Sequence, residues 1–396
     1  MKVNEQGIKK WKVLLVHNYY QIPGGEDMVV ANEKKMLEEN GHQVIVYSRH
    51  NSELKEMHIL RKLLLPITTI FNPRTYREIR RIIRKNKIDI VHVHNTLNLI
   101  SPAVYYAALI CKVPVVQTIH NFRLLCPGAS FYRDGHICEE CIKFGLSCAV
   151  KHNCYRGSKI QTLGCVISML IHRLMKIYGK INYICLTEFN KEKLLNLKQI
   201  SRERVFVKPN FVDATGESLP AEQRKNQLVF AGRLDKLKGI DVLLKTWKQM
   251  GKDVPKLIVC GTGPMEEWCK NFIAQNRINV EMKGFVKNSE VRELLATSKA
   301  LIMPTQWFEG FPMSIVEAFS VGTPVLCSNL GNLDSMVING VNGWKFDSLS
   351  ENELKVALRH VEEDASLYFT TIQVYNAKYT KQINYNMLCN IYAACK

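Results

Sequence analysis

The amino-acid sequence predicts an α/β protein with two doubly wound parallel-sheet domains, and three observations support this fold class. The chain has 396 residues, more than one ordinary hydrophobic core accommodates. Short, nearly continuous apolar runs alternate with longer runs of helical periodicity in both halves, which is typical of parallel strands buried on both faces. Turn-forming residues cluster at 208–220 (KPNFVDATGESLP), where we expect the two domains to join.

The expected strands recur along each half, with helical runs between them. They are 12–18, 43–49, 88–95, 113–120 and 183–189 in the N-terminal half, and 227–234, 256–263, 280–286, 300–305 and 324–329 in the C-terminal half. We therefore assign 1–212 to one domain and 213–378 to a second. The remaining run, 379–396, has helical periodicity, and the sequence does not show where it packs.

Composition restricts the class of protein. The apolar fraction of 46% excludes a disordered chain. No run of 18 uncharged apolar residues occurs and no apolar signal core follows MKVNEQGIKKW, so we expect a cytoplasmic protein without a spanning helix. Up to residue 212, 33 Lys and Arg face 16 Asp and Glu, whereas from residue 213 on the numbers are 21 and 20. The basic N-terminal half is therefore expected to contact an anionic partner.

Ligands of open parallel sheets bind beyond the carboxyl ends of the strands, so the residues that follow each strand matter most. Gly24 and Gly25 follow the first strand and precede a helix, where backbone N–H groups can approach an anion. Taken alone, a plain turn is the better interpretation. His120 ends the fourth expected strand, where a ligand hydroxyl and a structural hydrogen bond are equally good partners. His92 and His94 share one face of the third strand, and packing is favoured for both.

The loop AGRLDKLKGI (231–240) precedes a helix that opens near Gly239. Arg233 and Lys238 lie in this loop. A guanidinium and an ammonium beside a helix N-terminus can hold a diphosphate. A solvated basic loop is the alternative, and taken alone it is the commoner one.

The stretch WFEGFPMSIVEAF contains the expected start of another helix. Pro312 suits the first turn of a helix because its missing N–H is not needed there. The helix is expected to end near Val321. The N–H groups of Gly310, Phe311 and Met313 would then be available to hydroxyl or phosphate oxygens.

Two glutamates flank this helix start. Glu309 precedes it, and Glu317 lies about one turn inside. Helical side chains lean toward the N-terminus, so the Glu317 carboxylate should point to the same place. A carboxylate about 4 Å from a phosphate is repelled by roughly 1–4 kcal/mol, so sugar hydroxyls are the expected partners of both acids. The alternative of a surface acid suits Glu309 better than Glu317, which lies in an apolar run.

Together these motifs resemble the retaining glycosyltransferases of family 4, the glycosyl transferases group 1 type. The strongest part is 305–331, which resembles the E-x7-E element of that family followed by its G-x-P-V motif. Supporting motifs are PGGED, IDIVHVHN, TIHNFRLLCP, KPNFVD, FAGRLDKLKGID, CGTGP, KGFV and NGVNGWKF. The resemblance covers nearly the whole chain and implies the GT-B fold, in which two Rossmann-like domains face each other across an interdomain cleft.

The resemblance also implies an activity and a set of roles. The donor would be a nucleotide-diphosphate sugar, bound by Gly24, Gly25, Gly310, Phe311, Pro312, Met313 and Glu317, the last at the ribose. His120 would touch the transferred sugar, Glu309 would bind its hydroxyls, and Arg233 and Lys238 would stabilise the leaving diphosphate. Transfer of a hexosyl group would proceed with retention and without a catalytic metal or other cofactor; the sequence has no Asp-x-Asp motif. One departure is GNLDS (331–335), where family members often have GGxxE.

Four cysteines in an insert, 126–154, have spacings compatible with a structural zinc site: Cys126, Cys138, Cys141 and Cys154. A similar insert occurs in a subset of the family. Reduced cysteines without a metal are the alternative.

The basic residues of the N-terminal half suit a membrane surface. The run 74–87 has seven positive charges and one negative, and 59–71 and 163–180 are apolar with basic residues. We expect these segments to contact anionic lipid on the inner face of the plasma membrane, although a solvated helix face is nearly as good an explanation for 74–87. A nucleic-acid partner is not expected, because no recognised motif occurs.

The leading hypothesis is therefore a glycosyltransferase that uses a nucleotide sugar and a glycan or lipid-linked acceptor, in surface polysaccharide or capsule biosynthesis. A sugar-nucleotide epimerase on the same fold is the second hypothesis. A non-enzymatic binder of membranes or nucleic acid is the third.

Overall fold

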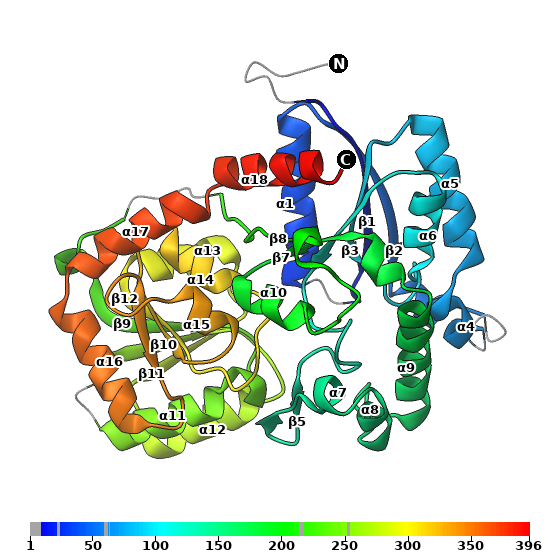
Figure 1. The fold of residues 1–396 in the computed structure, drawn as a ribbon. Coiled ribbons are helices and arrows are strands. Elements are labelled where there is room, and N and C mark those ends of the chain that lie inside the picture. Colours follow the sequence, from blue (N-terminus) through cyan, green and yellow to red (C-terminus); the bar gives the residue numbers. More distant parts are fainter. Residues whose placement is uncertain (1–8, 22–23, 59–61, 63, 214–217, 252–253) are drawn as a thin grey trace. The chain divides into compact units, whose positions relative to one another are not determined.

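The computed structural model describes residues 9–21, 24–58, 62, 64–213, 218–251 and 254–396. Contacts divide the chain into two compact units (Figure 1). The first, here called the N-terminal unit, comprises Met1–Arg133, Cys138–Pro209 and Asn384–Lys396. The second, the C-terminal unit, comprises Asp134–Ile137 and Asn210–Ile383. The C-terminal residues of the chain thus belong to the N-terminal unit, which the sequence does not reveal.

A six-stranded parallel sheet forms the centre of the N-terminal unit, in the order β2-β1-β3-β4-β7-β8. Its strands are β1 Lys12–Tyr19, β2 Gln43–His50, β3 Ile90–Asn95, β4 Val115–Ile119, β7 Asn182–Cys185 and β8 Val205–Val207. The strand order changes direction at β1, which lies between β2 and β3, and such switch points are where open α/β sheets bind ligands. Two short strands, β5 Tyr132–Arg133 and β6 His136–Ile137, lie outside this sheet.

Helices accompany the N-terminal sheet: α1 Gly25–Glu39, α2 Glu53–Glu56, α4 Leu65–Ile70, α5 Pro73–Asn86, α6 Ala103–Ile110, α7 Glu140–Lys143, α8 Ser147–Lys151, α9 Lys159–Leu174, α10 Glu188–Leu194 and α18 Lys381–Ala394. Local sequence sets their ends. Asn72 caps α5 by accepting from two backbone N–H groups, and Pro73 occupies the first helical position. Ser158 caps α9 by accepting from the backbone N–H of Gln161, and the buried positions of that helix recur at helical spacing.

The C-terminal unit has a second six-stranded parallel sheet, in the order β11-β10-β9-β12-β13-β14. Its strands are β9 Lys225–Ala231, β10 Lys256–Cys260, β11 Val280–Gly284, β12 Ser298–Met303, β13 Val325–Ser328 and β14 Gly343–Phe346. Its helices are α11 Ile240–Met250, α12 Glu266–Asn276, α13 Asn288–Ala296, α14 Met313–Phe319, α15 Asn332–Met336, α16 Glu351–Glu363 and α17 Ser366–Lys378.

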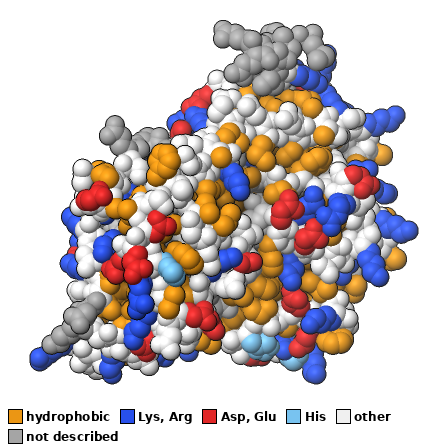
Figure 2. All heavy atoms as spheres, turned by 60° about the vertical axis from the view of Figure 1, so that its left-hand side comes forward, with side chains coloured by type: hydrophobic (Ala, Val, Ile, Leu, Met, Phe, Trp, Pro, Cys, Tyr) orange, Lys and Arg blue, Asp and Glu red, His pale blue; other side chains and the backbone are white. Residues whose placement is uncertain are grey.

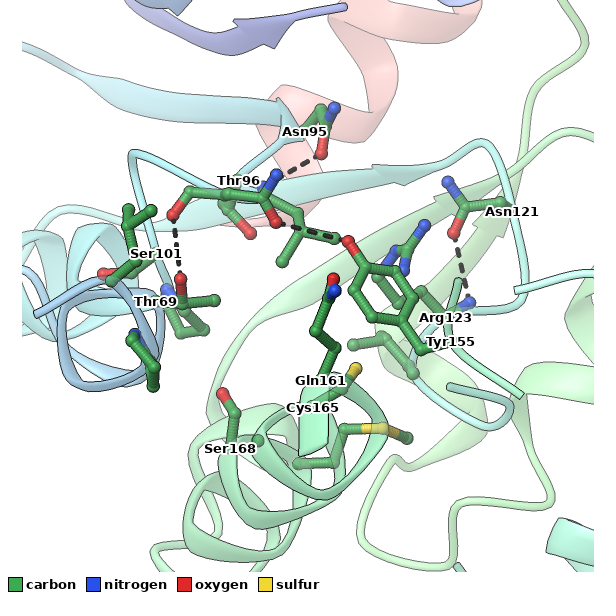
Figure 3. Close-up of a pocket in the computed structure, with 18 of the residues that line it drawn as sticks. Thr69, Asn95, Thr96, Ser101, Asn121, Arg123, Tyr155, Gln161, Cys165 and Ser168 are labelled. Carbon is green, nitrogen blue, oxygen red and sulfur yellow. Dashed lines mark hydrogen bonds between the residues drawn. The ribbon is translucent and has the colours of Figure 1, made fainter. Parts of the chain in front are cut away.

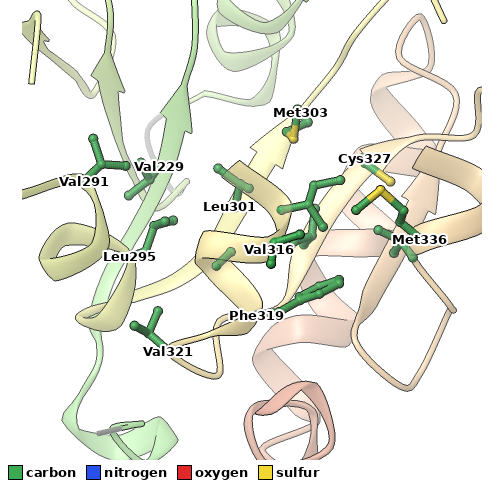
Figure 4. Close-up of a cluster of buried hydrophobic side chains, with 14 of the residues drawn as sticks. Val229, Val291, Leu295, Leu301, Met303, Val316, Phe319, Val321, Cys327 and Met336 are labelled. Carbon is green, nitrogen blue, oxygen red and sulfur yellow. The ribbon is translucent and has the colours of Figure 1, made fainter. Parts of the chain in front are cut away.

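Alternating residues of the central strand β9 enter two separate hydrophobic clusters. Val229 packs with Leu301, Val316 and Phe319 in one cluster (Figure 4). Leu228 and Phe230 enter the other cluster, which contains the fully buried Trp247. Since successive strand residues point to opposite faces, both faces of this sheet are covered.

The predicted α/β fold with two doubly wound sheets is confirmed. Each of the ten predicted strands has a counterpart, whereas β8 and β14 were not predicted. Helix α14 ends at Phe319 rather than near Val321, and Pro312 is its N-cap residue, one position before the predicted first turn. Among the described residues, no helix is both long and apolar enough to cross a bilayer.

Candidate functional site

The predicted site residues of the C-terminal unit come from the ends of two neighbouring strands, β9 and β12. The loop after β9 contains Arg233 and Lys238 and is closely packed. A Cβ on Gly261 would lie 1.9 Å from the carbonyl oxygen of Gly232, and a Cβ on Gly239 would lie 1.9 Å from that of Pro304. Both glycines also have positive φ. These close approaches fix the course of the loop.

Lys238 and Glu309 form an ion pair, with 2.7 Å between Nζ and Oε1. The same carboxylate oxygen accepts hydrogen bonds from Thr305 Oγ1 and Trp307 Nε1, each at 3.0 Å. Glu309 is buried, whereas the Lys238 side chain is 24% exposed. Arg233 lies in the same loop and is largely exposed, with its Nε 3.4 Å from Asp235 Oδ2. The structure therefore brings Lys238 and Glu309 together, 71 residues apart in sequence.

The backbone between Glu309 and α14 is fixed by a residue that the sequence analysis did not single out. Asn332 donates from Nδ2 to the carbonyl oxygens of Glu309 and Gly310. Gly331 has φ +58°, and a Cβ there would lie 2.6 Å from the Phe308 ring. The segment GNLDS thus supports the loop that contains Glu309. Its acidic residue, Asp334, instead pairs with Lys345 at 2.6 Å on the surface.

Glu317 has a different environment from Glu309. It lies in α14, is 8% exposed, and accepts a hydrogen bond from Asn288 Nδ2 at 3.2 Å. Burial raises the pKa of Glu317, and the nearby charge of Arg292 opposes that shift only in part. Of the predicted backbone positions, Gly310, Phe311 and Met313 are half-buried and Pro312 is buried.

In the N-terminal unit, His120 follows β4 and begins a chain of buried polar groups. Its Nε2 lies 2.9 Å from His94 Nδ1, and His94 Nε2 lies 3.2 Å from Glu33 Oε2. The other Glu33 oxygen lies 2.7 Å from Lys208 Nζ, which also donates to Asn384 Oδ1 at 2.7 Å. Glu33 and Lys208 are almost completely inaccessible to solvent. This series of polar groups links His120, at the end of a strand, to Asn384 near the C-terminus of the polypeptide.

Within this series of hydrogen-bonded groups, the charged side chains are those of Glu33 and Lys208. Burial by itself would raise the pKa of Glu33, but the charge of Lys208 and the contact with His94 hold it well below its usual range. Burial holds the pKa of His120 well below its usual value and lowers the pKa of His92 to about 3. Both imidazoles are therefore neutral at pH 7.

Glu33, His92 and His94 place one ligand atom each within 4.8 Å of one another, as a metal centre requires. Both nitrogens of His92 are occupied, one by Tyr392 Oη and one by Thr118 Oγ1, each at 2.8 Å. The Lys208 ammonium already supplies a cation to Glu33. We therefore assign this group as a buried ion pair with its hydrogen-bonding partners.

Gly24 and Gly25 lie at the N-terminus of α1, and Pro23 of the predicted motif lies outside the described residues. Space is open around both glycines, since a Cβ on either would meet no atom within 4 Å. The Gly24 N–H donates to Asp27 Oδ2 at 2.9 Å, and Asp27 Oδ1 lies 2.7 Å from His17 Nε2. An anion at this helix start would therefore have the Asp27 carboxylate nearby.

Cys126, Cys141, Cys148 and Cys154 of the insert lie near one another. Burial raises the pKa of Cys141 to about 12, with a further contribution from Cys126, Cys154 and Cys148. In a tetrahedral site with Zn–S bonds of about 2.3 Å, the sulfurs lie about 3.8 Å apart. Among the described residues, no three of these sulfurs lie within 4.8 Å of one another. Zinc binding by Cys126, Cys138, Cys141 and Cys154 stays a prediction.

The chain is similar to known glycosyltransferases in sequence and in fold. A family model described as "Glycosyl transferases group 1" matches residues 213–378, and one described as "Glycosyltransferase Family 4" matches residues 23–138. An uncharacterized 41.2 kDa protein in the cps region of Klebsiella pneumoniae is 24% identical over 83% of this chain and 84% of its own. An uncharacterized glycosyltransferase of Methanocaldococcus jannaschii is 26% identical over 87% and 86%. The solved structure of Anabaena HepE with UDP-glucose has a TM-score of 0.64 and 15% identity, covering 97% of this chain and 100% of that one.

Proposed function

Because the chain belongs to the group 1 glycosyltransferases of GT-B fold, we propose that it is a retaining, metal-independent hexosyltransferase. Its donor is a nucleotide-diphosphate sugar, and its acceptor is a glycan or lipid-linked sugar in surface polysaccharide or capsule synthesis. The observation that carries the proposal is the Lys238–Glu309 pair at the strand ends of the C-terminal sheet. It combines a cation for a departing diphosphate with a carboxylate for sugar hydroxyls.

The leaving group sets the main chemical requirement. Breaking the glycosidic bond to a nucleoside diphosphate adds negative charge to the departing phosphate, and fixed cations stabilise that charge. Lys238 is held by Glu309, so its ammonium is positioned before the donor binds. Arg233 is exposed, and its planar guanidinium suits bidentate contacts to phosphate oxygens. These two cations take the place of a catalytic metal.

The two glutamates have separate roles in this proposal. Glu309 accepts hydrogen bonds from Lys238, Thr305 and Trp307, and in the proposed reaction it also accepts from sugar hydroxyls. Glu317 lies about one turn inside α14 and binds the ribose hydroxyls of the donor. Its buried position, which raises its pKa, suits a partner that brings hydrogen bonds rather than negative charge.

His120 acts as a neutral imidazole in the proposed reaction. Burial keeps it uncharged, and His94 occupies one of its ring nitrogens. The other nitrogen can form a hydrogen bond to a hydroxyl of the transferred sugar. Gly24 and Gly25 add backbone close to the donor phosphates, where the open space above them admits a ligand.

Two comparisons support the substrate class. The HepE structure that resembles this chain contains UDP-glucose, and one relative is encoded in a capsule region. A nucleotide sugar as donor and a surface glycan as product follow as the working assignment for this chain.

The N-terminal unit carries the features expected of a protein that binds an anionic membrane. Arg77, Arg80, Arg81, Arg84 and Lys85 of α5 border one hollow on the surface. Helix α9 exposes a series of apolar side chains: Ile160, Leu163, Ile167, Leu170, Ile171 and Leu174. The basic hollow on α5 contrasts with the face drawn in Figure 2, where basic and acidic side chains intermingle. We place the enzyme on the cytoplasmic face of the plasma membrane, with each basic residue near the lipid contributing about 1 kcal/mol.

The decisive experiment compares two lysines of the same loop. A thermal-shift screen with UDP-, GDP-, ADP- and dTDP-sugars first identifies the donor, because a ligand that binds the native state raises its stability. Lys238→Ala should then reduce turnover of that donor by about 10²–10³-fold. Lys236→Ala, which removes an exposed charge two residues away, should leave turnover nearly unchanged. Full activity in Lys238→Ala would refute the diphosphate role, and isomerised donor without transfer would indicate an epimerase.

A further inference from the structure

A cavity of about 410 Å³ lies within the N-terminal unit, beyond the carboxyl ends of β3 and β4. Helices α4 and α9, which pack against each other, contribute much of its wall. Figure 3 shows Gln161, Cys165 and Ser168 on α9, with Thr69 and Tyr155 from other segments. His94 and His120 line the same cavity. The residue proposed to contact the transferred sugar is therefore part of this wall.

The charge of the lining is of one sign. Its cations are Lys62, Arg123 and Arg156, and no aspartate or glutamate is among the described residues that line it. The guanidinium carbons of Arg123 and Arg156 each lie 5.4 Å from the centre of the Tyr155 ring. The nearby Glu26 carboxyl, whose pKa burial raises to about 8, is mainly protonated at pH 7 and does not offset Arg123. The cavity is therefore suited to an anion.

Apolar side chains also line the cavity, which a purely ionic ligand would not require. They include Leu54, Leu65, Pro66, Leu97, Ile119, Leu124, Ile160 and Met169. Ile160 lines the cavity and is also 82% exposed, so it lies at the rim. From there the exposed apolar side chains of α9 continue along the outside of the helix to Leu174. A hydrocarbon chain that leaves the cavity would thus meet apolar surface.

Two features of the N-terminal unit keep the cavity open and support its wall. Gly164 lies inside α9, where glycine costs about 1 kcal/mol relative to alanine, and a Cβ there would meet no atom within 4 Å. Its missing side chain leaves the cavity open. The cysteine-rich insert packs its own small core, including Cys141 and Leu146, against Val166 and Met169 of α9. The insert therefore supports the wall from behind, with or without a metal.

We propose that this cavity binds the acceptor and that the acceptor is an amphipathic anion, a sugar joined through phosphate or diphosphate to a long hydrocarbon chain. Arg123 and Arg156 bind the phosphates, and the hydrocarbon leaves past Ile160 along α9. Asn98, Asn121 and Gln161 line the cavity, and their side-chain NH₂ groups can donate to sugar hydroxyls. The inference rests on the proposed transferase function and narrows its acceptor to the lipid-linked class; a soluble glycan would leave the apolar lining unexplained.

Farnesyl diphosphate is a suitable probe, with pyrophosphate and farnesol as its separate halves. Calorimetric titration of the full-length protein should show farnesyl diphosphate binding at least 10-fold more tightly than either half. Arg156→Ala should weaken this binding about 10-fold, while Arg202→Ala, which changes an exposed arginine outside the cavity, should not alter it. Gly164→Leu should abolish binding by filling the cavity.

Leu174→Ser controls for adhesion to the outside of α9, since Leu174 is 14 residues from Ile160, about 21 Å along the helix. Binding should survive this change. Equal affinity for pyrophosphate, or binding that Gly164→Leu and Arg156→Ala leave intact, would overturn the proposal. Donor turnover in the absence of acceptor is measured on the unmodified protein. If this protein turns over the donor but does not bind farnesyl diphosphate, the acceptor assignment fails and the transferase assignment stands.

Discussion

The two units contain the same kind of parallel sheet but bury different chemistry around it. In the C-terminal unit, β9 lies between two apolar clusters, and the charged site groups Lys238 and Glu309 lie in loops at the strand ends. In the N-terminal unit, His92 lies within the sheet itself and Glu33 on α1 pairs with the fully buried Lys208. A shared fold therefore does not determine where charge is buried.

The C-terminal residues of the chain explain how the N-terminal unit accommodates its polar interior. Asn384, Tyr385 and Tyr392 lie on α18. Asn384 accepts from Lys208, while the hydroxyl groups of Tyr385 and Tyr392 lie 2.9 Å from His42 Nε2 and 2.8 Å from His92 Nδ1. A helix at the end of the sequence thus supplies hydrogen-bonding partners to groups hundreds of residues earlier.

The largest expected effect comes from Glu33→Ala. It leaves the Lys208 ammonium buried without its carboxylate, which should cost roughly 3–5 kcal/mol of unfolding free energy. Urea denaturation measures the loss. The matched change in the C-terminal unit is Glu317→Gln, which keeps an oxygen for the Asn288 hydrogen bond and should cost less than about 1 kcal/mol. Similar losses for both variants would remove the distinction between the units.

Acidification should destabilise the N-terminal unit first. Burial lowers the pKa of His17 and His42 to about 4 and that of His92 to about 3. Between pH 6.5 and 4 the unfolded chain takes up protons that these folded histidines do not, so their contribution to stability is full above pH 6.5 and falls as the pH drops toward 4. Glu26, whose pKa burial raises to about 8, acts in the opposite direction, but it is one group against three. The raised pKa of Glu317 acts in the opposite direction in the C-terminal unit.

Hydrogen exchange at pH 7 and pH 5 distinguishes the two units peptide by peptide. Protection of β1 and β3 should decrease at pH 5, while that of β9 and β12 should change little. An equal decrease in both sheets, or an earlier one in β9, would contradict the interpretation.

A smaller effect is expected for Tyr392→Phe. Removing the hydroxyl leaves His92 Nδ1 without its partner in a fully buried site, at a cost of about 1–3 kcal/mol. Tyr379→Phe, in the C-terminal unit, removes another buried tyrosine hydroxyl and serves as the control. If the two variants had the same midpoint of denaturation, α18 would not have the supporting role described above.

Much of the fold could be predicted because long apolar runs mark buried parallel strands. The missed strands, β8 with the sequence VFV and β14 with GWKF, are too short to show such a run. The E-x7-E element identified the loop and helix around Glu309, because its spacing is specific. Local sequence contained no sign that Asn332 would hold this loop.

Long-range pairs were beyond the sequence analysis. Lys208 meets Glu33 across 175 residues, and the pairing depends on how α1 and the segment after β8 are placed in three dimensions. The cavity beside α9 was likewise not predicted, although 59–71 and 163–180, which supply part of its lining, were expected to contact lipid. Such features depend on contacts between segments, which periodicity and composition do not report.

The central claim is that Lys238, held in place by Glu309, stabilises the leaving diphosphate, and a double-mutant cycle on donor turnover tests it most directly. Lys238→Ala, Glu309→Gln and the double variant are compared at a saturating concentration of the donor. We expect the double variant to lose no more turnover than the worse single variant, since either change disrupts the same pair. Losses that simply multiply, or a Lys238→Ala enzyme as active as the unmodified one, would contradict the claim.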